Sequence, residues 1–134
     1  MKNASLLLLC TLIGGCATQA PESAPRSQAL IDIEGYAVAS CLTLQADPYL
    51  RDQGDGWAAV IVQRAQGDLD GLATIAEAVR HASSENPMAI IRAEGDAGKD
   101  KSLPILYCNE LIDTPTVRQA IRQTVTAFSP LYQP

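Results

Sequence analysis

The side chains of this chain that could carry out chemistry are few, namely four cysteines and a single histidine. A cysteine beside a histidine can act as a nucleophile, and clusters of the two residue types bind zinc. His81 falls on the polar face of an expected helix, and no cysteine or second histidine lies near it in the sequence. We therefore interpret it as an exposed surface histidine. The sequence contains no glycine-rich phosphate loop either, so we expect no cofactor, no bound metal and no enzymatic activity.

The first fifteen residues have the pattern of an export signal. Lys2 precedes an apolar run over residues 6–13. That run is far shorter than the roughly 18 to 20 residues needed to span a bilayer. We therefore expect residues 1–15 to be a targeting segment that is removed.

The residues after the apolar run, LIGGC at positions 12–16, resemble the lipobox of bacterial lipoproteins. The resemblance implies cleavage before Cys16 and acylation of that cysteine. Several acyl chains on one residue give stable anchoring, since each buried methylene contributes roughly 0.8 kcal/mol. Because Ala17 rather than aspartate follows, the resemblance also implies a periplasmic protein anchored to the outer membrane. The alternative is an ordinary secretory signal with an incidental cysteine.

Removal of Cys10 with the signal and acylation of Cys16 leave two cysteines, Cys41 and Cys108. The periplasm is oxidising, so an exported chain with two cysteines is expected to join them in a disulfide. Closing so long a loop would stabilise the fold by about 4 kcal/mol in the chain-entropy description. The alternative is a pair of separate buried thiols.

The charge and the composition of the segment after the lipobox indicate how the protein contacts its surroundings. The formal net charge is −5, which gives no electrostatic reason to bind nucleic acid or anionic lipid headgroups. We expect membrane contact only through the lipid. Residues 16–28 offer little to bury and are expected to be a disordered tether, with a reach of roughly 20 Å.

Residues 29–134 are expected to form a small all-α domain, a bundle of about five helices stapled by one disulfide. Aromatic residues make up only 4% of the chain, so the core must be aliphatic. Apolar residues recur at steps of three and four, and these steps predict helices over residues 29–45, 69–83, 102–112 and 114–128. Between the first two of these, a further helix includes Trp57 and is expected to end at Gly67.

Several details of these helices follow from single residues. The first helix has apolar residues on two faces, so it should be central. Asp47 and Pro48 look like the start of the second helix, and Gly54-Asp55-Gly56 should break or restart it. Asp68 and Ser102 should cap the third and fourth helices. The fourth has apolar residues all round and should be buried. Between the third and the fourth helices, residues 84–101 are expected to be a long mobile loop. This loop is either functional or an idle insertion.

Three stretches carry a resemblance to a known family. They are YAVASCL at residues 36–42, the small-residue helix around Trp57, and LPILYC at residues 103–108 followed by a short closing helix. In this order they resemble the immunity proteins of type VI secretion amidase effectors. These are small exported helical proteins that neutralise peptidoglycan amidases. The chain departs from the family in its lipobox and in a longer, more charged loop.

The resemblance implies a mechanism of occlusion. Members of the family act as homodimers that plug the cleft of an NlpC/P60-type cysteine amidase with a protruding loop. Carried to this sequence, the plug would comprise Arg92, Glu94, Gly95, Asp96, Gly98, Lys99, Asp100 and Lys101. Its charged side chains would pair with groups at the rim of the toxin, and the glycines would let the backbone approach closely.

Two other functions are consistent with the same features. Secretin pilotins are also small helical lipoproteins with one disulfide, and they bind an extended or helical peptide in a groove between helices. A hydrophobic groove would favour a pilotin, whereas a charged loop favours an inhibitor. An inhibitor of host lysozyme would suit the compartment, although no specific motif indicates it.

Overall fold

The computed structural model describes residues 26–65, 69–92 and 99–132 of the chain. Its five α-helices are α1 (Gln28–Thr43), α2 (Pro48–Arg64), α3 (Asp70–Glu85), α4 (Pro104–Leu111) and α5 (Pro115–Phe128), and the 3-10 helix η1 (Ser129–Tyr132) follows them. Two short strands, β1 (Ile90–Ile91) and β2 (Lys101–Ser102), lie between α3 and α4. For these residues, the predicted small all-α bundle of about five helices is confirmed.

The expected export signal, the lipid-bearing Cys16 and most of the tether lie outside the described residues. The tether had been expected to extend to residue 28. The last of its residues, Gln28, instead begins α1, and Ser27 caps this helix by accepting a hydrogen bond from the backbone N–H of Leu30 at 3.2 Å. Within the described ranges, no helix is both long and apolar enough to cross a membrane.

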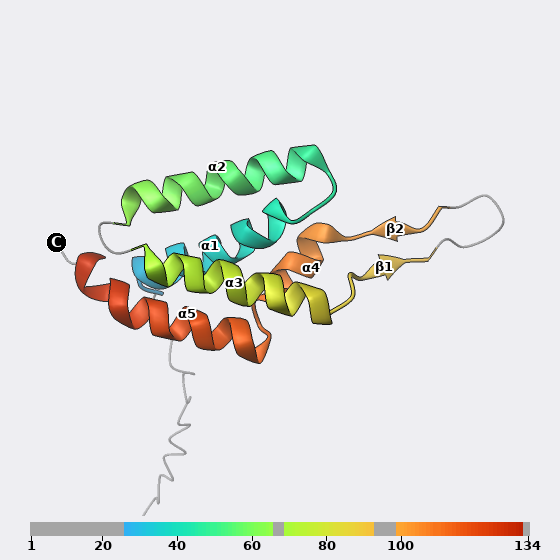
Figure 1. The fold of residues 1–134 in the computed structure, drawn as a ribbon. Helices are drawn as coiled ribbons and strands as arrows, with labels where there is room; N and C mark the ends of the chain where they lie inside the picture. The colour runs from blue at the N-terminus through green and yellow to red at the C-terminus, as the bar shows by residue number, and fades with distance from the viewer. Residues whose placement is uncertain (1–25, 66–68, 93–98, 133–134) are drawn as a thin grey trace, which may run out of the picture.

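Helix α1 lies at the centre of the bundle, as its two apolar faces predicted. It packs against α2, α3, α4 and α5 (Figure 1). The side chains of Ile33, Ala37 and Cys41 on its inner face are fully buried. Helix α2 covers the outside of α1 and contributes only Gly54 and Ile61 to the interior. The bundle therefore rests on one helix that contacts all of the others.

The predicted break at Gly54-Asp55-Gly56 is wrong, because α2 runs without interruption from Pro48 to Arg64. Gly54 lies where α2 crosses α1 most closely. A Cβ atom on Gly54 would lie 2.8 Å from the carbonyl oxygen of Ala39 and 2.9 Å from Cβ of Leu42. The absence of a side chain at Gly54 therefore allows α1 and α2 to pack closely, and the glycine forms no turn. The predicted start of α2 is confirmed, since Asp47 accepts a 2.8 Å hydrogen bond from the N–H of Tyr49.

The prediction of a buried fourth helix is also wrong. Ile105 and Leu106 of α4 are 68% and 43% exposed, whereas Tyr107, Cys108 and Leu111 are buried. The reason is that α4 has only eight residues and packs against α1 and α3 on one side. Ser102 does not cap it, because Ser102 belongs to β2 and no side chain caps α4. Asp68, the expected cap of α3, lies outside the described residues.

The segment predicted to be a long loop, residues 84–101, is partly regular. Helix α3 extends to Glu85, and β1 pairs with β2 in an antiparallel ribbon. Branched apolar residues, here Ile90 and Ile91, favour extended backbone, and they form a strand although charged residues follow them.

The predicted disulfide between Cys41 and Cys108 is present. The two Cα atoms are 5.5 Å apart, the cysteines are separated by 67 positions, and both are fully buried. The bond joins the central helix α1 to the short helix α4. It is therefore the covalent link that places α4 and the ribbon before it.

One buried carboxylate, that of Asp32, closes the opposite end of the bundle. Asp32 is 2% exposed. It accepts hydrogen bonds from Gln28 Nε2 at 2.9 Å and from the Tyr132 hydroxyl at 3.1 Å, and Arg64 Nη2 lies 3.2 Å away. Burial of the Tyr132 hydroxyl, together with its hydrogen bond to Asp32, raises the pKa of Tyr132 to about 12. The cluster ties the start of α1 to the ends of α2 and η1, and it was not foreseen from the sequence.

Replacement by alanine should change the free energy of unfolding in opposite directions at Gly54 and at Gly56. We expect Gly54→Ala to lower the free energy of unfolding by about 1–3 kcal/mol, because the Cβ would overlap backbone atoms of α1. Gly56→Ala is the matched control. No atom lies within 4 Å of its Cβ, so the variant should gain about 0.5–1 kcal/mol of helix stability. Denaturant unfolding measures both values, and equal effects would contradict the close approach at Gly54.

Candidate functional site

The most prominent surface feature is the hairpin formed by β1 and β2, which projects from one end of the bundle (Figure 1). In its register, Ile90 lies opposite Ser102 and Ile91 lies opposite Lys101. The hairpin leaves the bundle after α3 and returns into α4. Helix α1 begins, and η1 ends, at the other end of the bundle (Figure 1). The strands of the hairpin therefore point away from the end of the bundle at which α1 begins.

The structure places half of the predicted contact residues and leaves the other half undescribed. Arg92, Lys99, Asp100 and Lys101 are exposed on the hairpin. The remaining candidates, Glu94, Gly95, Asp96 and Gly98, lie outside the described residues. The described candidates therefore share one projecting element, with three cationic side chains close to its two strands.

Apolar side chains are the part of this surface that sequence reasoning missed. Ile90 and Ile91 on β1 are 57% and 53% exposed. Ile105 and Leu106, exposed in the first turn of α4, follow directly after the hairpin. Exposed apolar groups gathered at one end of a small protein indicate a contact surface for another molecule. The signal was available in the branched residues of β1, which had been assigned to a loop.

Tyr107 fixes both legs of the hairpin to the bundle. Its hydroxyl lies 3.0 Å from Ser83 Oγ, 3.0 Å from the carbonyl oxygen of Asn86 and 3.2 Å from that of Ser83. These groups belong to the end of α3, where the last carbonyls have no partner within the helix. The next residue, Cys108, carries the disulfide to α1. The Tyr107 hydroxyl thus holds the residues before β1, and the disulfide at Cys108 holds the helix that follows β2.

A pocket of about 500 Å³ lies at the base of the hairpin, between β2 and the start of α2. At its inner side, the buried Gln45 donates from Nε2 to the carbonyl oxygen of Cys41 at 2.9 Å, with Cys108 Sγ 3.5 Å away. In the ribbon, β2 lies on the side of α2 and β1 lies on the side on which α3 ends (Figure 1). The pocket is lined by Gln45, Ala46, Asp47, Leu50, Met88, Lys101, Ser102 and Pro104.

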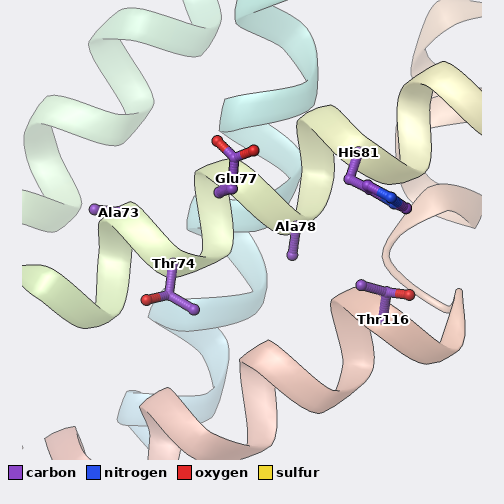
Figure 2. Close-up of a pocket in the computed structure, with 6 residues that line it drawn as sticks. All are labelled: Ala73, Thr74, Glu77, Ala78, His81 and Thr116. Carbon is purple, nitrogen blue, oxygen red and sulfur yellow. The ribbon is translucent and has the colours of Figure 1, made fainter.

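A second hollow, of about 560 Å³, lies in the groove between α3 and α5 (Figure 2). Thr74 and Ala78 point toward α5, Thr116 points toward α3, and Glu77 points away (Figure 2). The groove is open and lined mostly by small side chains. Its full lining is Ala73, Thr74, Glu77, Ala78, His81 and Thr116.

The predicted surface position of His81 is confirmed. Its side chain is 58% exposed, and Nδ1 lies 3.3 Å from Glu85 Oε2. Both described cysteines are joined in the disulfide, so neither offers a thiolate that His81 could activate. Among the described residues, no three histidine, cysteine or acidic side chains gather in a way that could hold a metal ion.

No protein-family model, curated protein or solved structure matches this chain. The function must therefore be argued from the hairpin and the groove themselves.

Removing the Tyr107 hydroxyl should loosen the hairpin without unfolding the bundle. We expect Tyr107→Phe to cost about 1–2 kcal/mol of stability, since two carbonyl groups at the end of α3 lose a donor. The backbone amides of Ile91 and Leu103 should exchange hydrogen faster. Ser83→Ala is the control, because it removes one hydroxyl contact and leaves both carbonyls bonded to Tyr107. Unchanged amide exchange in Tyr107→Phe would show that the hydroxyl does not position the hairpin.

Proposed function

We propose that this protein is a periplasmic immunity protein, whose hairpin binds a peptidoglycan amidase toxin of the type VI secretion system and occludes its active site. The observation that carries the proposal is the hairpin, which projects from the bundle and exposes apolar and cationic side chains (Figure 1). The expected toxin is a cysteine amidase of the NlpC/P60 type. In this proposal the protein binds no cofactor and catalyses no reaction.

The dimensions of the hairpin support a role as a plug. A two-stranded ribbon is about 5 Å wide between its strand axes, so it can enter a cleft that excludes a bundle of five helices. The ties through Tyr107 and the disulfide hold the strands in one position before binding. A contact element that is ordered in advance loses less conformational entropy when it binds.

The direction of the hairpin is consistent with a lipid-anchored inhibitor. A tether attached ahead of α1 would enter at the end of the bundle opposite to the hairpin (Figure 1). With a reach of roughly 20 Å, it would let the domain reorient while the hairpin faces away from the membrane. This arrangement would hold the inhibitor in the compartment in which an amidase reaches peptidoglycan.

A direct assay tests the proposal. The mature chain, with its disulfide intact, should abolish hydrolysis of peptidoglycan fragments by one member of a panel of NlpC/P60-type amidases. Lys99→Glu should then slow association by about tenfold, because charges near a contact surface act mainly on the association rate. Arg122→Glu on α5 makes the same change of charge away from the hairpin and should have no such effect.

Two results of this assay would contradict the proposal. One is that no amidase in the panel is inhibited by the wild-type chain. The other is an inhibited amidase for which replacement of residues 92–101 by a short turn, in a chain that still folds, leaves inhibition unchanged. The second result would remove the hairpin from the mechanism.

The groove between α3 and α5 favours a second candidate, a pilotin-like protein that assists secretin assembly. Its open, small-residue lining could accept a helical peptide (Figure 2). Recovery of a secretin subunit in place of an amidase, with binding lost in Ala78→Arg and kept in Lys99→Glu, would select this function. The hairpin would have no part in such a complex, which is why we place the inhibitor first.

The proposed anchor makes a separate prediction about where the protein is found. The Cys16→Ala variant should move from the membrane fraction to the soluble fraction, since it has no sulfur to acylate. Cys10→Ala removes the other cysteine of the N-terminal region and should stay with the membrane. Fractionation followed by mass spectrometry of the first mature residue gives the result. A membrane-bound Cys16→Ala variant would contradict lipid anchoring at this residue.

A further inference from the structure

We propose that the outer edge of β1 takes up an extended segment of the amidase, so that the partner's backbone joins the hairpin as a third strand. The inference rests on the proposed function and specifies the contact that the hairpin makes. It assigns binding to the backbone and apolar side chains of β1, whereas the sequence alone directed attention to charge.

The pairing pattern shows which backbone groups face outward. Leu103 donates from its N–H to the carbonyl oxygen of Ala89 at 3.1 Å, so these two residues form a hydrogen-bonded pair of the antiparallel ribbon. Such pairs alternate with pairs whose N–H and C=O groups point away from the partner strand. Ile90 and Ser102, the next pair in the register, therefore direct their backbone groups to the two outer edges. Ile90 supplies them on the β1 side.

The two edges differ in their surroundings. The β2 edge faces the start of α2, where Asp47 and Leu50 share a pocket with Lys101 and Ser102. Lysine is also a residue that discourages pairing at a strand edge. The β1 edge lies on the other side of the ribbon (Figure 1), and both residues of β1 are isoleucines. The residue types of β1 therefore favour pairing with a new strand more than those of β2.

The side chains of β1 suit the same occupant. Ile90 and Ile91 point to opposite faces of the ribbon, because successive residues of a strand alternate, and both are more than half exposed. An extended segment placed beside β1 would cover branched apolar groups on both faces, while its backbone would pair with that of Ile90. Strand addition of this kind takes affinity from main-chain hydrogen bonds and specificity from alternate side chains.

A second copy of this chain is a poorer occupant. Two hairpins paired edge to edge would join strands of two residues each and would cover few side chains. A specific interface buries more than about 1,000 Å². The walls of an enzyme cleft supply the missing area, because they also surround Ile105 and Leu106 next to the hairpin.

The experiment uses the mature chain and an NlpC/P60-type amidase that the wild-type chain inhibits. Ile90→Pro removes the outward N–H and leaves the inward hydrogen bonds of the ribbon in place. Ile90→Ala removes the same side chain and keeps the N–H. We expect inhibition by Ile90→Pro to be roughly tenfold weaker than by Ile90→Ala. Ser102→Pro removes the matching donor on the β2 edge and should inhibit within about twofold of wild type, by the same hydrogen-bond argument.

Amide hydrogen exchange of the unmodified chain gives an independent result that does not depend on how a proline variant folds. When the amidase binds, exchange at the Ile90 amide should slow by tenfold or more, as expected for a newly formed backbone hydrogen bond, and exchange at Ser102 should not change. Protection at Ser102 alone, protection at neither residue, or protection of Ile90 in a dimer of this chain without the amidase would each overturn the inference. Inhibition with an unprotected Ile90 amide overturns the added strand and leaves the proposed function intact, whereas a wild-type chain that inhibits no amidase contradicts both.

Discussion

The bond between Cys41 and Cys108 is the constraint on which the exposed part of this structure depends. It joins the helix that contacts all the others to the shortest α-helix of the described residues. A helix of eight residues is too short to be stable alone in water, and Ile105 and Leu106 in its first turn face solvent. Helix α4 therefore keeps its position through the disulfide and the packing of Tyr107. The hairpin, which enters α4 directly, takes its direction from the same two residues.

The two ends of the bundle are stabilised in different ways. At the end where α1 begins, the carboxylate of Asp32 is buried and receives partners from α1, α2 and η1. In the described residues, every buried side-chain nitrogen or oxygen has such a partner, so this end has satisfied its polar groups internally. Both ends expose some large apolar side chains, but only at the hairpin end of the described residues do they lie on a strand, as Ile90 and Ile91 of β1. An exposed strand edge with apolar side chains is a surface on which another chain can pair. This edge is what directs the functional proposals to the hairpin.

The candidate functions differ in the surface that they use. An inhibitor that plugs a cleft needs a narrow, projecting element, and the two strands of the hairpin form one (Figure 1). A pilotin needs a concave surface between helices, and the hollow along α3, which Thr116 of α5 also lines, is the shallow surface proposed for that role. Because the hairpin and the groove lie on different elements, variants of one can be made without disturbing the other. The two proposed mechanisms would share the same compartment and anchor, and they rest on the same disulfide.

The sequence by itself determined the helical class of the fold, the central place of α1 and the pairing of two cysteines. These follow from local spacing and from the number of cysteines, which need no knowledge of three-dimensional contacts. Only the tertiary structure decided what depends on neighbours distant in the chain. Gly54 reads as a helix breaker until Ala39 is placed against it. Asp32 looks like a polar residue in an apolar helix until Arg64 and Tyr132 reach it from far along the chain. The strand character of Ile90 depends on Ser102, its partner twelve residues away across a segment whose charges suggested a loop. A strand is stabilised only once such a partner is in place.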